Sequence, residues 1–168
     1  MIDRRRTLRL ALAALPAALL ASPPARAEQA FERFFPFLID LPGWTGDKPD
    51  GMAMQLGGLD IMTATRKYTR DGAHIEVGIL TGPAAQAGLA MLKSGMKFET
   101  SEGHVVTETV DGVKMARTYT AKDKSGAILI GVADSALFNF AYTGITEDEA
   151  RGLAKRFDWK GIAAALPK

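Results

Sequence analysis

Hydrophobic and polar residues alternate through much of the chain, with the period of two that is typical of β-strands. The first such run, LDIMTATRKYT at 59–69, is followed by the turn RDGA and by HIEVGIL at 74–80. An Asp-Gly pair between two alternating runs is a strong signal for a β-hairpin. A second hairpin is predicted where Asp111-Gly112 separates HVVTETV from VKMARTYT, and two apolar strands follow at 127–133 and 136–142.

A different period, that of a helix, begins after the first hairpin. In 82–98, apolar residues at spacings of three and four share one helical face: Leu89, Leu92 and Met96. Gly88 and Gly95 weaken this helix but would let it lie close to a sheet. The segment is therefore predicted as a helix that packs on the strands around it.

The two ends of the chain predict shorter helical segments. Thr146 and Glu149 form a capping box, which predicts a helix over 147–157, and DWKGIAAALPK supplies a final short turn. The residues of this helix that would face the core are Ala150, Leu153, Ala154 and Phe157. Before the first strand, FERFFPFL is short helical or irregular because Pro36 stops a long helix, and TGDKPDG at 45–51 is predicted as a loop.

Together these elements predict an α+β fold, with a largely antiparallel β-sheet and helices packed on it. Strands joined by hairpins are neighbours in the sheet and run antiparallel. No long Ser/Gly or charged linker divides residues 28–168, and no internal repeat is present. We therefore expect 28–168 to form a single globular domain.

Residues 1–27 have the three regions of a cleaved export signal, namely the basic MIDRRRTLR, the apolar LALAALPAALLA, and SPPARA with small residues before the cleavage point. The apolar run is too short for a stable membrane anchor, which needs roughly 20 apolar residues. The pair Arg4-Arg5 also fits the twin-arginine export pattern, so that route and general secretion both stay open. Either route predicts a periplasmic or otherwise exported protein with no membrane anchor after cleavage.

The charge of the chain changes sign once this signal is set aside. Five of the 21 basic and one of the 19 acidic residues lie in 1–27, which leaves 16 basic against 18 acidic residues and a net charge of −2. No Lys/Arg cluster remains in 28–168, which argues against a nucleic-acid partner. The chain has no cysteine, so an exported domain must be held together by packing alone.

Several short motifs appear in a familiar order. LPGW at 41–44 precedes a hairpin and the helix in mid-chain, the second hairpin reads DGVKMARTYT, paired apolar strands end in FNFAY, and the closing helix ends in FDW at 157–159. This arrangement, over most of 31–160, resembles the PsbP-like α/β/α sandwich that also occurs in periplasmic DcrB-like proteins. The resemblance implies that fold and a role as an accessory, binding or assembly factor, and it supplies no catalytic residues to transfer.

Four residues are candidates for ligand or partner binding. Trp44 lies in a loop rich in turn-forming residues, where an exposed indole would stack on a ligand and a buried one would close the end of the core. The density of aromatic residues just before it favours the structural interpretation. Arg66, Arg117 and Tyr119, which we place on neighbouring strands, would form a polar patch for an anionic ligand, or would simply face solvent.

The residues offer little for a metal or for catalysis. A transition-metal site needs several converging ligands, whereas the chain has two histidines, His74 and His104, and no cysteine. Met52-x-Met54 is the one close methionine pair after residue 27, too little clustering for a copper site. No Gly-x-Ser-x-Gly elbow, His-Glu-x-x-His pair or phosphate loop is present. We therefore expect no catalytic residue, no metal and no cofactor.

The resulting hypothesis is an exported, non-enzymatic accessory or assembly factor that binds a protein partner of the envelope. An alternative is a carrier that holds a small apolar or anionic ligand between the sheet and the helix at 83–98. A metal-binding protein or a hydrolase is a more distant alternative. An enclosed pocket would favour the carrier, whereas exposed apolar surface would favour partner binding.

Overall fold

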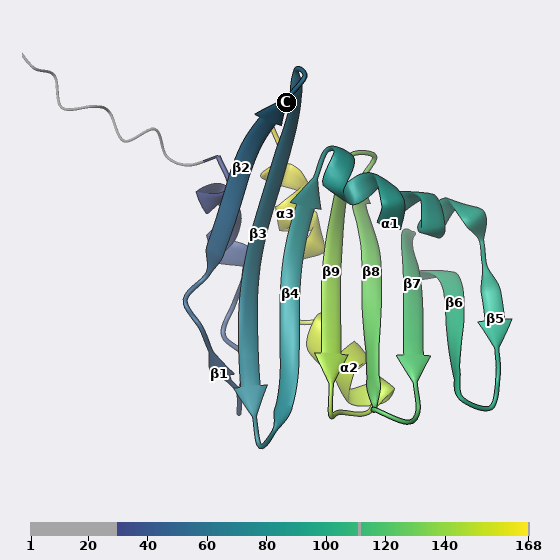
Figure 1. The fold of residues 1–168 in the computed structure, drawn as a ribbon. Coiled ribbons are helices and arrows are strands. Elements are labelled where there is room, and N and C mark those ends of the chain that lie inside the picture. The colour runs from purple at the N-terminus through teal and green to yellow at the C-terminus, as the bar shows by residue number, and fades with distance from the viewer. Residues whose placement is uncertain (1–29, 111, 168) are drawn as a thin grey trace, which may run out of the picture.

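The computed structural model describes residues 30–110 and 112–167, so the predicted export signal at 1–27 lies outside the described residues. At its centre is one continuous antiparallel sheet of nine strands, with helices on both faces (Figure 1). The fold is α+β with a largely antiparallel sheet, as the sequence predicts.

The strands follow one another across the sheet in the order β1-β3-β4-β9-β8-β7-β6-β5. The strand β2 lies on the same edge of β3 as β1: β1 pairs with the C-terminal end of β3, and β2 pairs with the part of β3 before it. Their bounds are β1 Thr45–Gly46, β2 Asp50–Leu56, β3 Leu59–Arg70, β4 Ala73–Thr81, β5 Lys97–Glu99, β6 Gly103–Val110, β7 Val113–Thr120, β8 Ser125–Ala133 and β9 Ala136–Thr143. Both predicted Asp-Gly hairpins are confirmed. Gly72 and Gly112 take the left-handed conformation that these tight turns require, with φ of 82° and 81°.

One face of the sheet, here named the covered face, carries the main core. The 3₁₀ helix η1 (Glu32–Phe37) and the helices α2 (Glu147–Ala154) and α3 (Trp159–Ala164) pack on it. Large, fully buried side chains from the central strands form the sheet side of this core: Val77, Ile79, Ile128, Ile130, Phe138 and Phe140. Because burial of each such side chain contributes roughly 1.5–3 kcal/mol, the covered face supplies most of the stability.

The opposite face, here named the open face, carries one described helix, α1 (Pro83–Ser94), which crosses the strands near one end (Figure 1). Its contacts with the sheet form a second and smaller cluster: Ala85, Leu89, Leu92, Ala116 and Leu137. A Cβ atom on Gly88 would come within 2.4 Å of a Leu137 methyl group, so this glycine lets α1 lie close to the sheet. Among the described residues no helix covers the other end of this face.

Three details of the predicted elements are wrong. The loop predicted at 45–51 contains β1 and the start of β2, because main-chain pairing with β3 outweighs its turn-rich composition. The helix predicted to run to 98 ends at Ser94, since Gly95 turns left-handed with φ of 65°, and the chain enters β5. Met96 therefore does not share the helix face and is 50% exposed.

The C-terminal helix is confirmed at its start and shorter than predicted at its end. The Thr146 side chain accepts a hydrogen bond from the backbone N–H of Glu149 at 3.3 Å, which is one half of a capping box, while the Glu149 side chain accepts from Arg70. The helix ends at Ala154 rather than 157, although Phe157 still reaches the core.

Candidate functional site

Arg66 fastens the N-terminal loop to the covered face. Its guanidinium donates to the backbone oxygens of Leu38 at 2.6 Å and Asp47 at 2.7 Å, and it pairs with the Asp40 carboxylate at 2.5 Å. The side chain is only 12% exposed. Beside it, the Tyr68 hydroxyl donates to the backbone oxygen of Ile39 at 2.7 Å. These contacts give Arg66 a structural role at the end of the loop.

Trp44 is half-buried and packs against the main core. The Arg70 guanidinium lies 4.3 Å from the centre of a Trp44 ring, a cation–π contact, and also pairs with Glu149 of α2 at 2.5 Å. The indole N–H is buried without a hydrogen-bond partner among the described residues. Trp44 thus joins the loop to β3 and α2, which supports the structural interpretation of this residue.

Arg117 and Tyr119 lie together on β7, but the predicted patch that also includes Arg66 does not form. Three strands separate β7 from β3, so the expectation of neighbouring strands is wrong. The Arg117 guanidinium donates to Glu108 at 2.9 Å and to Glu147 at the start of α2. The sequence favours a capping role for Glu147 and gives no indication of this second contact.

The same carboxylate joins a wider network on the covered face. His104 Nε2 lies 3.1 Å from a Glu147 oxygen, and the His104 ring is 5.8 Å from the ring of Tyr119. Burial lowers the pKa of Arg117, but its bond to Glu108 and the charge of Glu147 outweigh burial and hold that pKa above its usual value. Both carboxylates are therefore already paired, and the network fastens α2 to β6 and β7.

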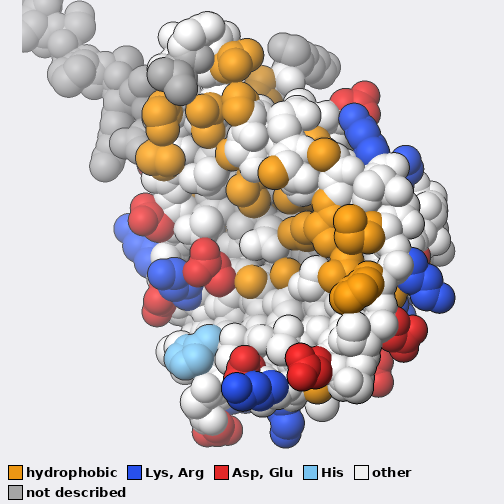
Figure 2. All heavy atoms as spheres, turned by 45° about the vertical axis from the view of Figure 1, so that its right-hand side comes forward, with side chains coloured by type: hydrophobic (Ala, Val, Ile, Leu, Met, Phe, Trp, Pro, Cys, Tyr) orange, Lys and Arg blue, Asp and Glu red, His pale blue; other side chains and the backbone are white. Residues whose placement is uncertain are grey.

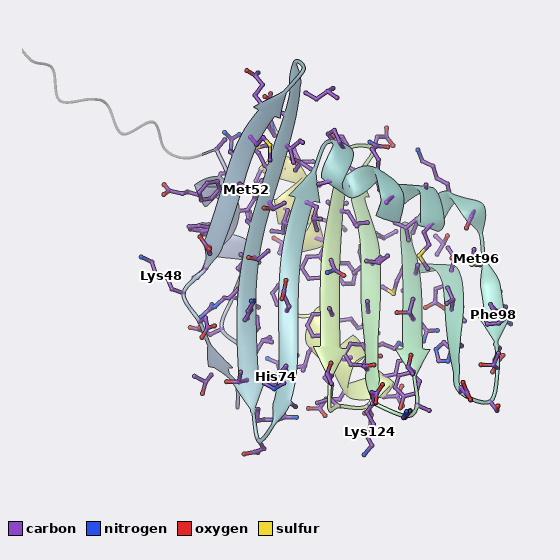
Figure 3. The ribbon with its side chains drawn as sticks, in the orientation of Figure 1. Lys48, Met52, His74, Met96, Phe98 and Lys124 are labelled. Atoms are coloured by element: carbon purple, nitrogen blue, oxygen red, sulfur yellow. The ribbon has the colours of Figure 1, made fainter. Side chains whose placement is uncertain are left out.

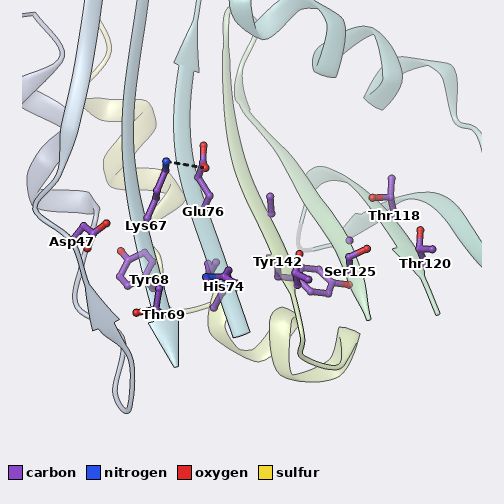
Figure 4. A pocket seen from close by; sticks show the side chains of 14 residues that line it. Asp47, Lys67, Tyr68, Thr69, His74, Glu76, Thr118, Thr120, Ser125 and Tyr142 are labelled. Atoms are coloured by element: carbon purple, nitrogen blue, oxygen red, sulfur yellow. Dashed lines mark ion pairs between the residues drawn. The ribbon is translucent and has the colours of Figure 1, made fainter. Parts of the chain in front are cut away.

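A different kind of surface lies on the open face, toward the end of the strands that α1 leaves uncovered. Here an open trough of about 590 Å³ runs across the sheet (Figure 4). Along its outer end runs a row of cross-strand neighbours, five hydroxyl residues and one histidine, which we name the hydroxyl row: Thr45, Thr69, His74, Thr143, Ser125 and Thr120. All of them except Thr45 line the trough. Neighbouring strands are about 4.8 Å apart, so the hydroxyl row presents polar groups at a regular spacing.

The next row inward combines one ion pair with small residues. Lys67 Nζ lies 4.0 Å from a Glu76 oxygen, and both side chains are more than half exposed (Figure 4). Beyond them the row continues through Ala141, Ala127 and Thr118. Because these side chains are short, the floor of the trough stays low and accessible.

The structure puts the two histidines on opposite faces of the sheet. His74 lies in the trough (Figure 3), whereas His104 faces α2 on the covered face. Within residues 30–110 and 112–167, no group of three or more His, Asp or Glu is arranged to hold a metal ion. Met62 and Met115 are buried in the main core, while Met52 and Met54 are exposed on β2.

Large apolar side chains are exposed at both edges of the open face. Figure 2 shows hydrophobic side chains over the upper part and the middle of this view, with charged side chains along its left, right and lower margins and at its upper right. Met52, Met54 and Leu59 belong to the β2–β3 hairpin, and Met96 and Phe98 belong to the opposite edge at β5 (Figure 3). The hairpin residues lie toward the α1 end of the sheet, since Met52 is opposite Thr63, whereas Phe98 lies in the same cross-strand row as Thr118.

None of the residues in the hydroxyl row is a candidate site residue from the sequence except His74, which is considered as a metal ligand. Its residues are spread over 45–143, and register, not spacing, brings them together. The available signal is weak: Thr and Ser fill the outward positions near the ends of β3, β7, β8 and β9.

Comparisons of this chain with protein-family models, with curated protein sequences and with solved structures found no match. None of the helices in the described part of the chain has the length and apolar character needed to span a bilayer.

Proposed function

We propose that this protein is an exported, non-enzymatic accessory or assembly factor whose protein partner binds across the trough on the open face. The observation that carries the proposal is the hydroxyl row, which crosses six strands from Thr45 to Thr120 without a covering helix among the described residues. Export itself rests on the signal pattern of residues 1–27.

Hydroxyl groups suit the recognition of a polypeptide because each one both donates and accepts hydrogen bonds. Their side chains are short and lose little rotamer freedom when a partner immobilises them, so binding costs less entropy than it would with Lys or Arg. The Lys67–Glu76 pair adds one charge of each sign at the side of the trough. The surface therefore suits a partner segment that is polar and close to neutral.

A protein partner fits better than either ligand of the carrier alternative. Directly between α1 and the sheet, where an apolar ligand would lie, the side chains of the second cluster pack together, and the pocket of about 540 Å³ beside Leu89 and Leu92 is open to solvent. Arg66 and Arg117, the expected anion ligands, are already paired with carboxylates. The trough is open to solvent, whereas a carrier of small molecules would need an enclosed pocket. The accessory role itself is taken from the PsbP-like resemblance of the sequence, with which helices on both faces of an antiparallel sheet are compatible.

Photo-crosslinking in the envelope of the native host tests the site. A crosslinking amino acid at Thr120 or Thr143 should capture one protein, and a matched probe at the exposed Lys155 just after α2 should not. Thr120→Arg or Thr143→Arg should abolish co-purification of that protein, whereas Lys155→Glu should leave it unchanged. Equal capture at Lys155, or co-purification that survives both arginine variants, would contradict the proposal.

Export has its own test, independent of the partner. The mature protein should begin at Glu28 and be recovered from the periplasmic fraction. A chain that retains residue 1 and stays in the cytoplasm would contradict export, and with it the proposal that the partner is an envelope protein.

A further inference from the structure

The strand β5 (Lys97–Glu99) ends the sheet on the side opposite β1 and β2. It pairs with β6 on one side, with Phe98 opposite Val105, and no described strand lies on its other side. An edge of this kind carries main-chain groups that a further strand is able to bind.

The direction of these main-chain groups follows from two hydrogen bonds. Thr107 N donates to Met96 O at 2.9 Å, and Thr100 N donates to Gly103 O at 2.8 Å, so residues 96 and 100 bond toward β6. In an antiparallel strand this direction alternates from one residue to the next. Lys97 and Glu99 therefore direct their N–H and C=O groups outward, away from β6.

Outward groups at 97 and 99 allow three antiparallel registers between two copies of β5. One register sets Lys97 opposite Lys97, and another sets Glu99 opposite Glu99. The register centred on Phe98 instead sets Lys97 of each copy opposite Glu99 of the other, with four main-chain hydrogen bonds. Opposite charges directly across a strand pair stabilise it and like charges destabilise it, so the edge specifies one register by charge.

The side chains on the open face reinforce the same register. Phe98 is 59% exposed and Met96 is 50% exposed, although both are large and apolar. In the register centred on Phe98, the two Phe98 rings become direct cross-strand neighbours and both Met96 side chains lie close by. Aromatic pairs across strands add roughly 0.2–1 kcal/mol relative to alanine.

We propose that the protein forms a homodimer in which β5 pairs antiparallel with β5 of a second copy, with Lys97 opposite Glu99 at both ends and the two Phe98 rings at the centre. The contact is isologous and joins two nine-stranded sheets into one. It is small, because β5 has three residues, so the dimer is weak and forms in a concentration-dependent way. The contact lies at the β5 edge and leaves the hydroxyl row free, so it is independent of the proposed partner site.

Sedimentation analysis of the mature chain with charge variants tests this dimer. The wild type should shift from monomer to dimer as its concentration rises. Lys97→Glu and Glu99→Lys should each remain monomeric at concentrations where the wild type dimerises, because each sets like charges opposite one another. Lys122→Glu, an exposed lysine in the turn after β7, is the charge-matched control and should dimerise normally.

Two recombinations of these variants make the test specific to register. The double variant Lys97→Glu/Glu99→Lys should dimerise again, because the charges are exchanged but still complementary. An equimolar mixture of the two single variants should form a heterodimer, since all charges then pair with opposites. A wild type that stays monomeric at every concentration, single variants that still dimerise, or a mixture that stays monomeric would each overturn the proposal.

Discussion

The two faces of the sheet differ in the size of the side chains that they bury and in how much of each face is covered. On the covered face, aromatic and branched residues from five strands meet η1, α2 and α3 in one continuous core. On the open face, α1 closes a small cluster of two alanines and three leucines, and a low polar floor extends beyond it. The ion pairs of the two faces differ in the same way. On the covered face, the pairs of Arg66 and Arg117 hold other elements against the sheet, whereas the Lys67–Glu76 pair on the open face is exposed to solvent.

This difference separates stability from recognition. If large side chains and helices covered both faces of the sheet, only its edge strands would be accessible to a partner. Here one face holds the fold together, so the other is free to keep short, accessible side chains. Substitutions on the two faces should therefore have different consequences.

The largest loss of stability is expected at the centre of the covered face. Phe140 is fully buried and contacts the ring of Phe157 at a centroid distance of 6.2 Å. Phe140→Ala should lower the free energy of unfolding by about 3–5 kcal/mol, through lost burial and the cavity left behind. Urea titration measures this loss, and Phe98→Ala is the control, because that ring is mostly exposed and its removal should cost no more than about 0.5 kcal/mol.

The second cluster should tolerate truncation better. Leu89→Ala should cost about 2–3 kcal/mol, near the lower end for buried leucines, because α1 is able to settle toward small neighbours such as Gly131. Hydrogen exchange should then rise in α1 while the amides of β4 and β9 stay protected. If Leu89→Ala lowered the free energy of unfolding as much as Phe140→Ala does, the two faces would not differ in their contribution to stability.

Removal of Arg117 should have an intermediate effect. Arg117→Met leaves Glu108 and Glu147 without their shared cation and should cost about 2 kcal/mol in unfolding free energy. Arg156→Met, at an exposed position just after α2, is the matched control and should change stability by less than about 0.5 kcal/mol. Equal stability of the two variants would show that the network does not fasten α2.

The covered face should also make stability depend on pH in the alkaline range. Burial raises the pKa of Tyr68 from 10.0 to about 12, so between these values the folded state retains a proton that the unfolded state loses. The free energy of unfolding should therefore fall as the pH rises from 10.0 toward about 12. Tyr68→Phe should cost about 1 kcal/mol at neutral pH, from the lost bond to Ile39, and should reduce that alkaline decline. Urea titrations of both chains across this range measure the two slopes, and identical slopes would contradict the assignment.

The smallest effect on stability is expected in the trough. Thr120→Val and Thr143→Val keep the β-branched shape and should change the free energy of unfolding by less than about 0.5 kcal/mol. Both should nevertheless weaken capture of the partner, because each removes a hydroxyl from the hydroxyl row. If the double variant captured the partner as well as the wild type does, these hydroxyl groups would not contribute to partner binding.

The periodic parts of this fold follow from the sequence, because local alternation and Asp-Gly turns determine the central hairpins directly. The strands β1, β2 and β5 are not among the elements predicted from the sequence: β1 and the start of β2 lie in a segment rich in turn-forming residues, and β1 and β5 have only two and three residues. The site is harder to predict. The hydroxyl row depends on the register of six strands, and the distance between Arg66 and Arg117 depends on strand order, neither of which local pattern specifies.

Amine labelling of lysines in the partner complex tests the division of the two faces most directly. Lys67 lies in the trough with its side chain 65% exposed, whereas Lys155 and Lys160 are exposed near the helices of the covered face. Binding of the partner should protect Lys67 from labelling and leave Lys155 and Lys160 as reactive as in the free protein. Protection of Lys155 and Lys160, with Lys67 still fully reactive, would contradict the account.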